Sequence, residues 1–255
     1  MDERDMRKQQ GFSLIELAIV FILMTLAIGG MLRPLSSEIE RYNIVETDKQ
    51  LKQIKEALLG YVAANRRLPC PASATSAGKE SFASGGSAVN GNCNSFAGFL
   101  PAATLGVMPA DAAGFALDAW GTTHNRIRYA VYGGTINGVS NPFTRTDGLR
   151  SATMASVASA TRLLVVCAAV SASGASSCTG SSLTDMAPFV VFSLGGNASS
   201  NPGGASAAEG SNLNSDHVFV AAPVNRTQGN VFDDQLAWES PHTLFSRMLA
   251  AGNLP

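Results

Sequence analysis

Gln10-Gly11-Phe12-Ser13-Leu14-Ile15-Glu16-Leu17 is the stretch that decides the organisation of this chain of 255 residues. Its glycine separates a polar leader, residues 1–11, from an apolar run that continues to Leu32. A helix over residues 12–32 would be about 31 Å long, which matches the hydrocarbon core of a bilayer. We therefore expect residues 12–32 to form the membrane-spanning half of a helix.

Glu16 is the only ionisable residue of that apolar run. An acidic side chain at the middle of a membrane helix costs roughly 2.5 kcal/mol or more, so its presence favours a functional role. The basic residues of the leader, Arg4, Arg7 and Lys8, favour a cytoplasmic N-terminus. The rest of the chain is then expected on the other side of the inner membrane, in the periplasm or outside the cell.

Gly-Phe-Ser-Leu-Ile-Glu, residues 11–16, resembles the processing and assembly motif of type IV prepilins and of the pseudopilins of type II secretion. The resemblance implies that a prepilin peptidase of the inner membrane cleaves between Gly11 and Phe12 and then methylates Phe12. It also implies that Glu16 pairs with the N-terminal amine of a neighbouring subunit in a pilus or pseudopilus. The alternative interpretation is a plain N-terminal anchor.

An amphipathic segment, residues 33–65, follows the apolar run. Its apolar residues recur at spacings compatible with one helical face: Ile44, Leu51, Ile54, Leu58 and Val62. We expect one helix from about Phe12 to Asn65, ~80 Å long, whose second half packs on a globular head. Leu68-Pro69-Cys70-Pro71 should end it, because a proline disfavours the helical conformation of the residue before it.

The head, residues 66–255, combines loop-like stretches with short apolar runs typical of strands. Loops are expected over about 72–98, 171–182 and 195–215, which are rich in Ala, Ser, Gly and Asn. Strands are expected at 127–132, 163–167, 189–194 and 218–220. Ser240-Pro241 and Gly252 bound a short C-terminal helix over about 241–251. The sequence thus predicts an α+β, pilin-like fold: the long helix packed on an antiparallel sheet, with a short C-terminal helix.

Four cysteines, Cys70, Cys93, Cys167 and Cys178, lie in this exported head. An even number in an oxidising compartment favours disulfides, and three pairings are possible. We favour Cys70–Cys93 and Cys167–Cys178, because each pair flanks a loop rich in Gly and Ser. Free buried thiols are the alternative, and without a Cys-x-x-Cys spacing zinc is not expected.

Two further segments resemble the major pseudopilin of type II secretion. Asp118-Ala119-Trp120-Gly121 is similar to its Asp-Pro-Trp-Gly turn, and we interpret it as a structural turn with a core tryptophan rather than a subunit contact. The segment from Ser193 to Asp216 resembles its calcium loop, with Asn197 and Asp216 as the candidate ligands.

Calcium is nevertheless not favoured, because neutral residues fill some of the acidic positions of that loop and calcium takes six to eight oxygen ligands. The loop also offers Glu209. The adjacent pair Asp233-Asp234 is interpreted as solvated. We therefore expect no cofactor.

Composition and motif content exclude several classes of function. The charge is balanced and 15 % of residues are charged, so the chain offers no basic stripe for nucleic acid. The three histidines, His124, His217 and His242, lack metal spacing, and no nucleophile or phosphate-binding motif is present.

We expect a structural filament subunit rather than an enzyme. Because the chain is bulky for a major pilin, a minor subunit at low copy or at the tip is favoured. An adhesive or substrate-binding module displayed by the filament is the alternative from another class. An anchored periplasmic enzyme is a third, without a recognisable site.

Overall fold

The computed structural model describes residues 13–254, apart from the side chains of residues 29–36. Its first element is the helix α1, Leu14–Asn65, which begins two residues after the predicted start and ends where predicted. The chain divides into two compact units, residues 1–42 and residues 43–255. The second unit contains the predicted head, residues 66–255, together with the last part of α1. From here on, "the head" means this whole unit.

The structure does not support the predicted membrane span. Within residues 13–254, no helix combines the length and the apolar character that crossing a bilayer requires. Of the predicted span 12–32, Phe12 and the side chains of residues 29–32 lie outside the described part of the chain.

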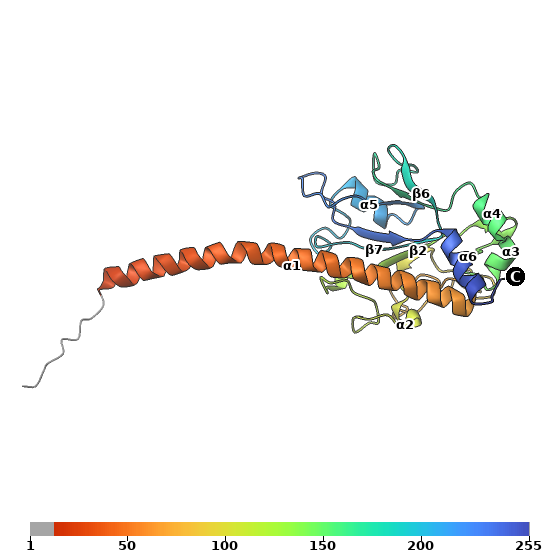
Figure 1. The fold of residues 1–255 in the computed structure, drawn as a ribbon, viewed down its shortest axis with the longest axis horizontal. Coiled ribbons are helices and arrows are strands. Elements are labelled where there is room, and N and C mark those ends of the chain that lie inside the picture. The colour runs from red at the N-terminus through yellow and green to blue at the C-terminus, as the bar shows by residue number, and fades with distance from the viewer. Residues whose placement is uncertain (1–12, 255) are drawn as a thin grey trace, which may run out of the picture. The chain divides into compact units, whose positions relative to one another are not determined.

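A four-stranded antiparallel sheet packs against α1 in the head. It contains β1 (Ala97–Phe99), β2 (Arg128–Val131), β7 (Phe189–Ser193) and β9 (Gln235–Trp238), in the order β1-β2-β7-β9. Figure 1 shows β2 and β7 beside the orange part of α1. The predicted helical stripe forms the contact, since Leu51, Ile54, Leu58 and Val62 are buried in one cluster with Tyr129, Val131, Phe189 and Val191.

A second sheet covers the opposite face of the first. It contains β5 (Leu164–Cys167), β6 (Ser182–Ala187) and β8 (Val218–Val220), in the order β6-β5-β8. Leu164, Val166 and Phe219 pack there against Ala130, Val190 and Phe192 of the first sheet. The strand β8 runs parallel to β5. The predicted antiparallel sheet on α1 is thus confirmed, whereas the second sheet, with its parallel pair, was not predicted.

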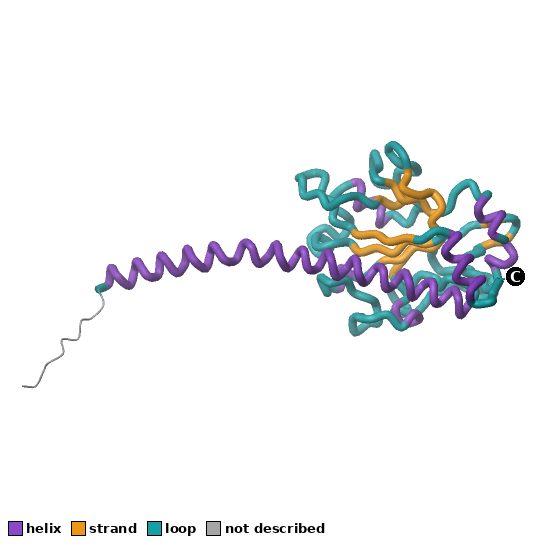
Figure 2. The backbone as a smooth tube through the Cα atoms, in the orientation of Figure 1, coloured by secondary structure: helices purple, strands orange, loops and turns teal. Residues whose placement is uncertain are grey.

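Short elements connect these layers, and Figure 2 shows them among long loops. They are α2 (Ala102–Leu105), a 3-10 turn (Thr123–Asn125), the hairpin β3 (Thr135–Ile136) and β4 (Val139–Ser140), α3 (Gly148–Ala152), α4 (Met154–Ala158) and α5 (Ala207–Leu213). The helix α5 lies inside a segment that was predicted to be a loop.

The C-terminal helix α6, Pro241–Ala250, is confirmed. The hydroxyl of Ser240 accepts a hydrogen bond from the Thr243 amide, which satisfies a free donor at the helix start. Arg247 of α6 forms an ion pair of 2.8 Å with Glu56 of α1. Figure 1 accordingly shows α6 in blue beside the end of α1.

Both predicted disulfides are present. The Cα–Cα distances are 5.3 Å for Cys70–Cys93 and 5.2 Å for Cys167–Cys178. Each pair closes a local loop, as the argument from the Gly- and Ser-rich segments required.

A nearly buried ion pair fixes the first of these loops to α1. Arg67 donates to both carboxylate oxygens of Glu80, with each N–O distance 2.7 Å. The guanidinium also donates to the Tyr61 hydroxyl at 3.0 Å, and Glu80 accepts from the Cys70 amide at 3.2 Å. The side chains of Arg67 and Glu80 are only 8 % and 17 % exposed.

The outer edge of β8 is closed by side chains instead of a strand. The Asn212 amide oxygen accepts from the Val220 N–H at 2.7 Å, and its nitrogen donates to the Val220 carbonyl at 3.1 Å. Asp216 Oδ1 accepts from the Val218 N–H at 2.7 Å. These bonds satisfy the N–H groups of Val218 and Val220 and the Val220 carbonyl, which an edge strand would otherwise present to another chain.

Candidate functional site: the N-terminal segment and an acidic cluster

Glu16 lies in the first turn of α1. Its Oε2 accepts a hydrogen bond from the backbone N–H of Ser13 at 2.9 Å, and the Ser13 carbonyl accepts from Leu17 N–H at 3.1 Å. A carboxylate at a helix start also interacts favourably with the helix dipole. Glu16 therefore binds a backbone donor one residue beyond Phe12, while Gly11 and Phe12 themselves lie outside the described residues.

The first part of α1 exposes an unusually large apolar surface. Its apolar side chains range in exposure from 50 % for Leu17 to 88 % for Leu14. They are Leu14, Ile15, Leu17, Ile19, Val20, Phe21, Ile22, Leu23, Met24, Leu26 and Ile28. A contiguous apolar surface of this kind marks an interaction with a protein or a membrane.

The second candidate site is an acidic cluster in the head, formed by Glu209, Asp233 and Asp234. One carboxylate oxygen from each lies within 4.8 Å of the others. Glu209 comes from α5, and the two aspartates immediately precede β9. Glu209 and Asp234 are buried, so the interpretation of Asp233-Asp234 as a solvated pair is wrong.

Hydrogen bonds to neighbouring amides hold the cluster together. Glu209 Oε1 accepts from Asn197 Nδ2 at 2.8 Å and from the Asp233 N–H at 3.1 Å, and Oε2 accepts from the Ala205 N–H at 2.5 Å. Asn212 Nδ2 donates to Asp234 at 2.7 Å. Asp233 Oδ1 is buried and has no hydrogen-bond partner among the residues that the structure describes.

Burial determines the electrostatics of the cluster. Desolvation, followed by repulsion from Glu209, raises the pKa of Asp233 to about 6. The same two effects, with repulsion from Asp233 added, raise the pKa of Asp234 well above its ordinary value, although the Asn212 hydrogen bond opposes them. A proton or a bound cation would each relieve this repulsion, and Asp233 Oδ1 is the oxygen open to either.

The two predicted calcium candidates are placed differently. Asn197 touches the cluster through its side chain and through its backbone N–H, which donates to Asp233 Oδ2 at 3.2 Å. Asp216 is not in the cluster, because its carboxylate caps the β8 edge instead. The sequence therefore pointed to two residues at the cluster, Asn197 and Glu209, and to one outside it, Asp216, but it did not predict the burial of Asp234.

The Asp118–Gly121 segment is a structural turn, as predicted, but its buried residue is not the tryptophan. Asp118 is only 2 % exposed, whereas Trp120 is half-buried. The Asp118 carboxylate accepts from Asn125 Nδ2 at 3.0 Å and from Ser193 Oγ at 2.5 Å. Burial raises the pKa of Asp118 despite these bonds. The turn thus fixes the end of β7 from which the loop to Asn197 departs.

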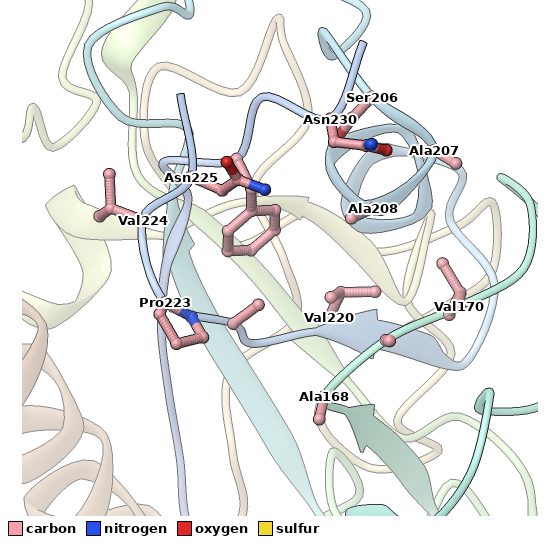
Figure 3. A pocket seen from close by; sticks show the side chains of 13 residues that line it. Ala168, Val170, Ser206, Ala207, Ala208, Val220, Pro223, Val224, Asn225 and Asn230 are labelled. Atoms are coloured by element: carbon pink, nitrogen blue, oxygen red, sulfur yellow. The ribbon is translucent and has the colours of Figure 1, made fainter. Parts of the chain in front are cut away.

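A pocket of about 440 Å³ opens at the C-terminal ends of the parallel strands β5 and β8. Figure 3 shows its small and apolar lining, with Val170 and Val220 on one side and Pro223 and Val224 on the other. Its polar side chains are Ser206, Asn225 and Asn230, and none of its lining residues is charged. The pocket therefore offers amide and hydroxyl groups but no titratable group.

Comparison with known proteins identifies the first of these sites. No curated protein and no solved structure matches the chain significantly. Residues 6–32, however, match the model of the prokaryotic N-terminal methylation motif. This match contains Gly11 and Phe12, the Glu16 carboxylate and the exposed apolar side chains of α1. The chain therefore carries the signature of the type IV pilins and pseudopilins.

Proposed function

We propose that this protein is a structural subunit of a type IV pilus or of a type II secretion pseudopilus. The observation that carries the proposal is the methylation motif at residues 6–32, continued by the exposed apolar side chains from Leu14 to Ile28. Burying these side chains against apolar surroundings is favourable by roughly 25 cal/mol per Å². The surroundings would be the inner membrane first and the helices of neighbouring subunits after assembly.

Processing is the first part of the proposal. A prepilin peptidase would remove residues 1–11 and methylate Phe12. Glu16 would then pair with the new terminal ammonium of a neighbouring subunit. In the described chain Glu16 accepts the Ser13 N–H at 2.9 Å, so its carboxylate is able to bind an N–H donor in this segment.

The head supports a minor position in the filament, at low copy or at the tip. It has two packed sheets, a separate hairpin and two disulfides, and the disulfides favour an oxidising compartment such as the periplasm. In this proposal the head acts in the filament through its shape and its surface contacts, and not through catalysis. Partners in this role are other pilin or pseudopilin subunits and the peptidase.

The intact mass of the protein extracted from membranes tests the processing. We expect the loss of residues 1–11 and the gain of one methyl group when the peptidase is present, and the full leader when it is absent. Retention of the leader in the presence of the peptidase would contradict the proposal.

A pair of substitutions on α1 tests assembly. Glu16→Ala removes the carboxylate from an apolar segment, so cleavage and membrane association should persist while incorporation into sheared filaments is lost. Glu38→Ala is the matched control, because Glu38 is exposed and forms a surface ion pair of 3.4 Å with Arg41. Normal incorporation of the Glu16→Ala variant would show that Glu16 has no role in assembly.

A further inference from the structure

Two adjoining hollows of about 390 and 480 Å³ form a polar groove on the head. Both are lined by Tyr132 and Arg162, so these two side chains lie where the hollows meet. Asp216 and His217 line one hollow, and Asn137 lines the other with hydroxyl side chains: Thr135, Ser156, Ser159 and Thr161. The groove therefore has charged groups beside an aromatic ring, whereas the pocket of Figure 3 has no charged residue in its lining.

Tyr132 is held in one position by its neighbours. Its ring lies edge-on to Phe143, with a centroid distance of 6.0 Å and an interplanar angle of 87°. The ring of His217 lies 5.7 Å away on the groove side. Gly134 allows this arrangement, because a Cβ there would lie 2.5 Å from the Tyr132 hydroxyl oxygen. The ring is therefore a fixed surface for a ligand, as a half-buried tyrosine with a polar tip often is.

Tyr132 and Arg162 both have polar groups that are free to bind a ligand in the groove. Within residues 13–254, the Tyr132 hydroxyl makes no hydrogen bond and Arg162 forms no ion pair. Arg162 is exposed, and its Nη2 donates to the Ser176 carbonyl at 2.7 Å, which fixes one end of the guanidinium. The remaining N–H groups are in the geometry that binds a carboxylate with two parallel hydrogen bonds.

We propose that this groove binds a saccharide that carries a carboxylate, such as a chain of uronic acid units. The apolar face of a sugar ring would lie on Tyr132, and its carboxylate would pair with Arg162. The hydroxyl groups of the adjacent units would bond to Asn137, Ser156 and Ser159 in one hollow and to Asp216 in the other. An inorganic anion such as phosphate fits less well, because it has no apolar face to lie on Tyr132.

The experiment measures binding of trigalacturonate to the full-length chain in detergent by isothermal titration calorimetry. The comparison ligands are a neutral galactose trisaccharide and inorganic phosphate. We expect trigalacturonate to bind with a Kd below about 1 mM, and the neutral trisaccharide and phosphate to bind at least tenfold more weakly. Filament assembly is not needed for this measurement, so its result is separate from the proposed structural role.

Two variants locate the site. Arg162→Gln should weaken trigalacturonate binding about tenfold or more, because the charge that would pair with the ligand carboxylate is removed from an exposed side chain. Arg150→Gln, in the exposed part of α3, is the matched control and should bind like the original chain. Tyr132→Leu should also weaken binding, with circular dichroism showing that the head remains folded.

Three results would overturn the proposal. The first is no heat of binding for trigalacturonate, and the second is equal binding of the neutral trisaccharide or of phosphate. The third is unchanged affinity in Arg162→Gln, which would place any binding elsewhere on the head.

Discussion

Replacing Glu80 with glutamine tests how much one nearly buried carboxylate contributes to the stability of the head. The change keeps the size of the side chain and removes its charge, so Arg67 loses both 2.7 Å ionic hydrogen bonds. Breaking a buried ion pair by neutralising one partner typically costs about 3–5 kcal/mol. The pair is 8 % and 17 % exposed rather than fully buried, which places it at the lower end.

The amide oxygen of glutamine can still accept one hydrogen bond from Arg67, which restores about 1 kcal/mol. We therefore expect Glu80→Gln to lower the free energy of unfolding by about 2–3 kcal/mol. The control is Asp48→Asn, because Asp48 lies 2.6 Å from Lys52 in an exposed pair on α1. That change should cost no more than about 0.5 kcal/mol.

The assay is urea denaturation of residues 38–255 with both disulfides intact, followed by circular dichroism. A third variant adds Arg67→Met to Glu80→Gln. It should be more stable than Glu80→Gln alone, because it removes the buried cation that the first change leaves unpaired. Equal losses in Glu80→Gln and Asp48→Asn, or a further loss in the double variant, would refute the reasoning from burial.

Four further outcomes are expected. Residues 38–255 should be soluble without detergent, because the exposed apolar side chains from Leu14 to Ile28 are then absent; gel filtration showing only aggregates would contradict this. Cys167→Ser with Cys178→Ser should destabilise the head by about 3 kcal/mol on the loop-entropy model, measured by the same urea assay. The pKa of Asp233 is raised to about 6 from about 3.9 in an unfolded chain, so the folded state binds more protons than the unfolded state between these pH values. The free energy of unfolding should therefore rise as the pH falls from 7 towards 5, and Asp233→Asn should reduce that rise. Millimolar calcium should leave the melting temperature at pH 7 unchanged, and a clear rise would instead place a cation at the cluster of Glu209, Asp233 and Asp234.

Strong local patterns allowed much of the fold to be predicted. The apolar run predicted the first part of α1 by its length, and the stripe from Leu51 to Val62 predicted the second part by its helical period. Phe189–Ser193 and Val218–Val220 were found because aromatic and β-branched residues stand between Gly-, Ser- and Asn-rich segments. The parallel pairing of β5 with β8 has no such signal, since it joins short strands that are far apart in the sequence.

The helix α5 was missed because its segment was interpreted from composition alone. Ser206 and Glu209 form the spacing of a capping box, and the Ser206 hydroxyl does accept from the Glu209 N–H at 3.3 Å. That signal would have placed Glu209 on a helix. The acidic cluster itself could not have been predicted, because Glu209 meets Asp233 and Asp234 only through the packing of α5 against the segment before β9.

The closed edge of β8 has a consequence for how copies of this protein can associate. Copies of a protein that are concentrated at one place can pair with one another through exposed edge strands. Such pairing would compete with ordered assembly. At β8, a second chain would first have to displace the Asn212 amide from Val220, and so lose two hydrogen bonds before forming any of its own. The β8 edge is therefore a poor site for strand pairing between copies, whereas the apolar side chains at the start of α1 remain exposed.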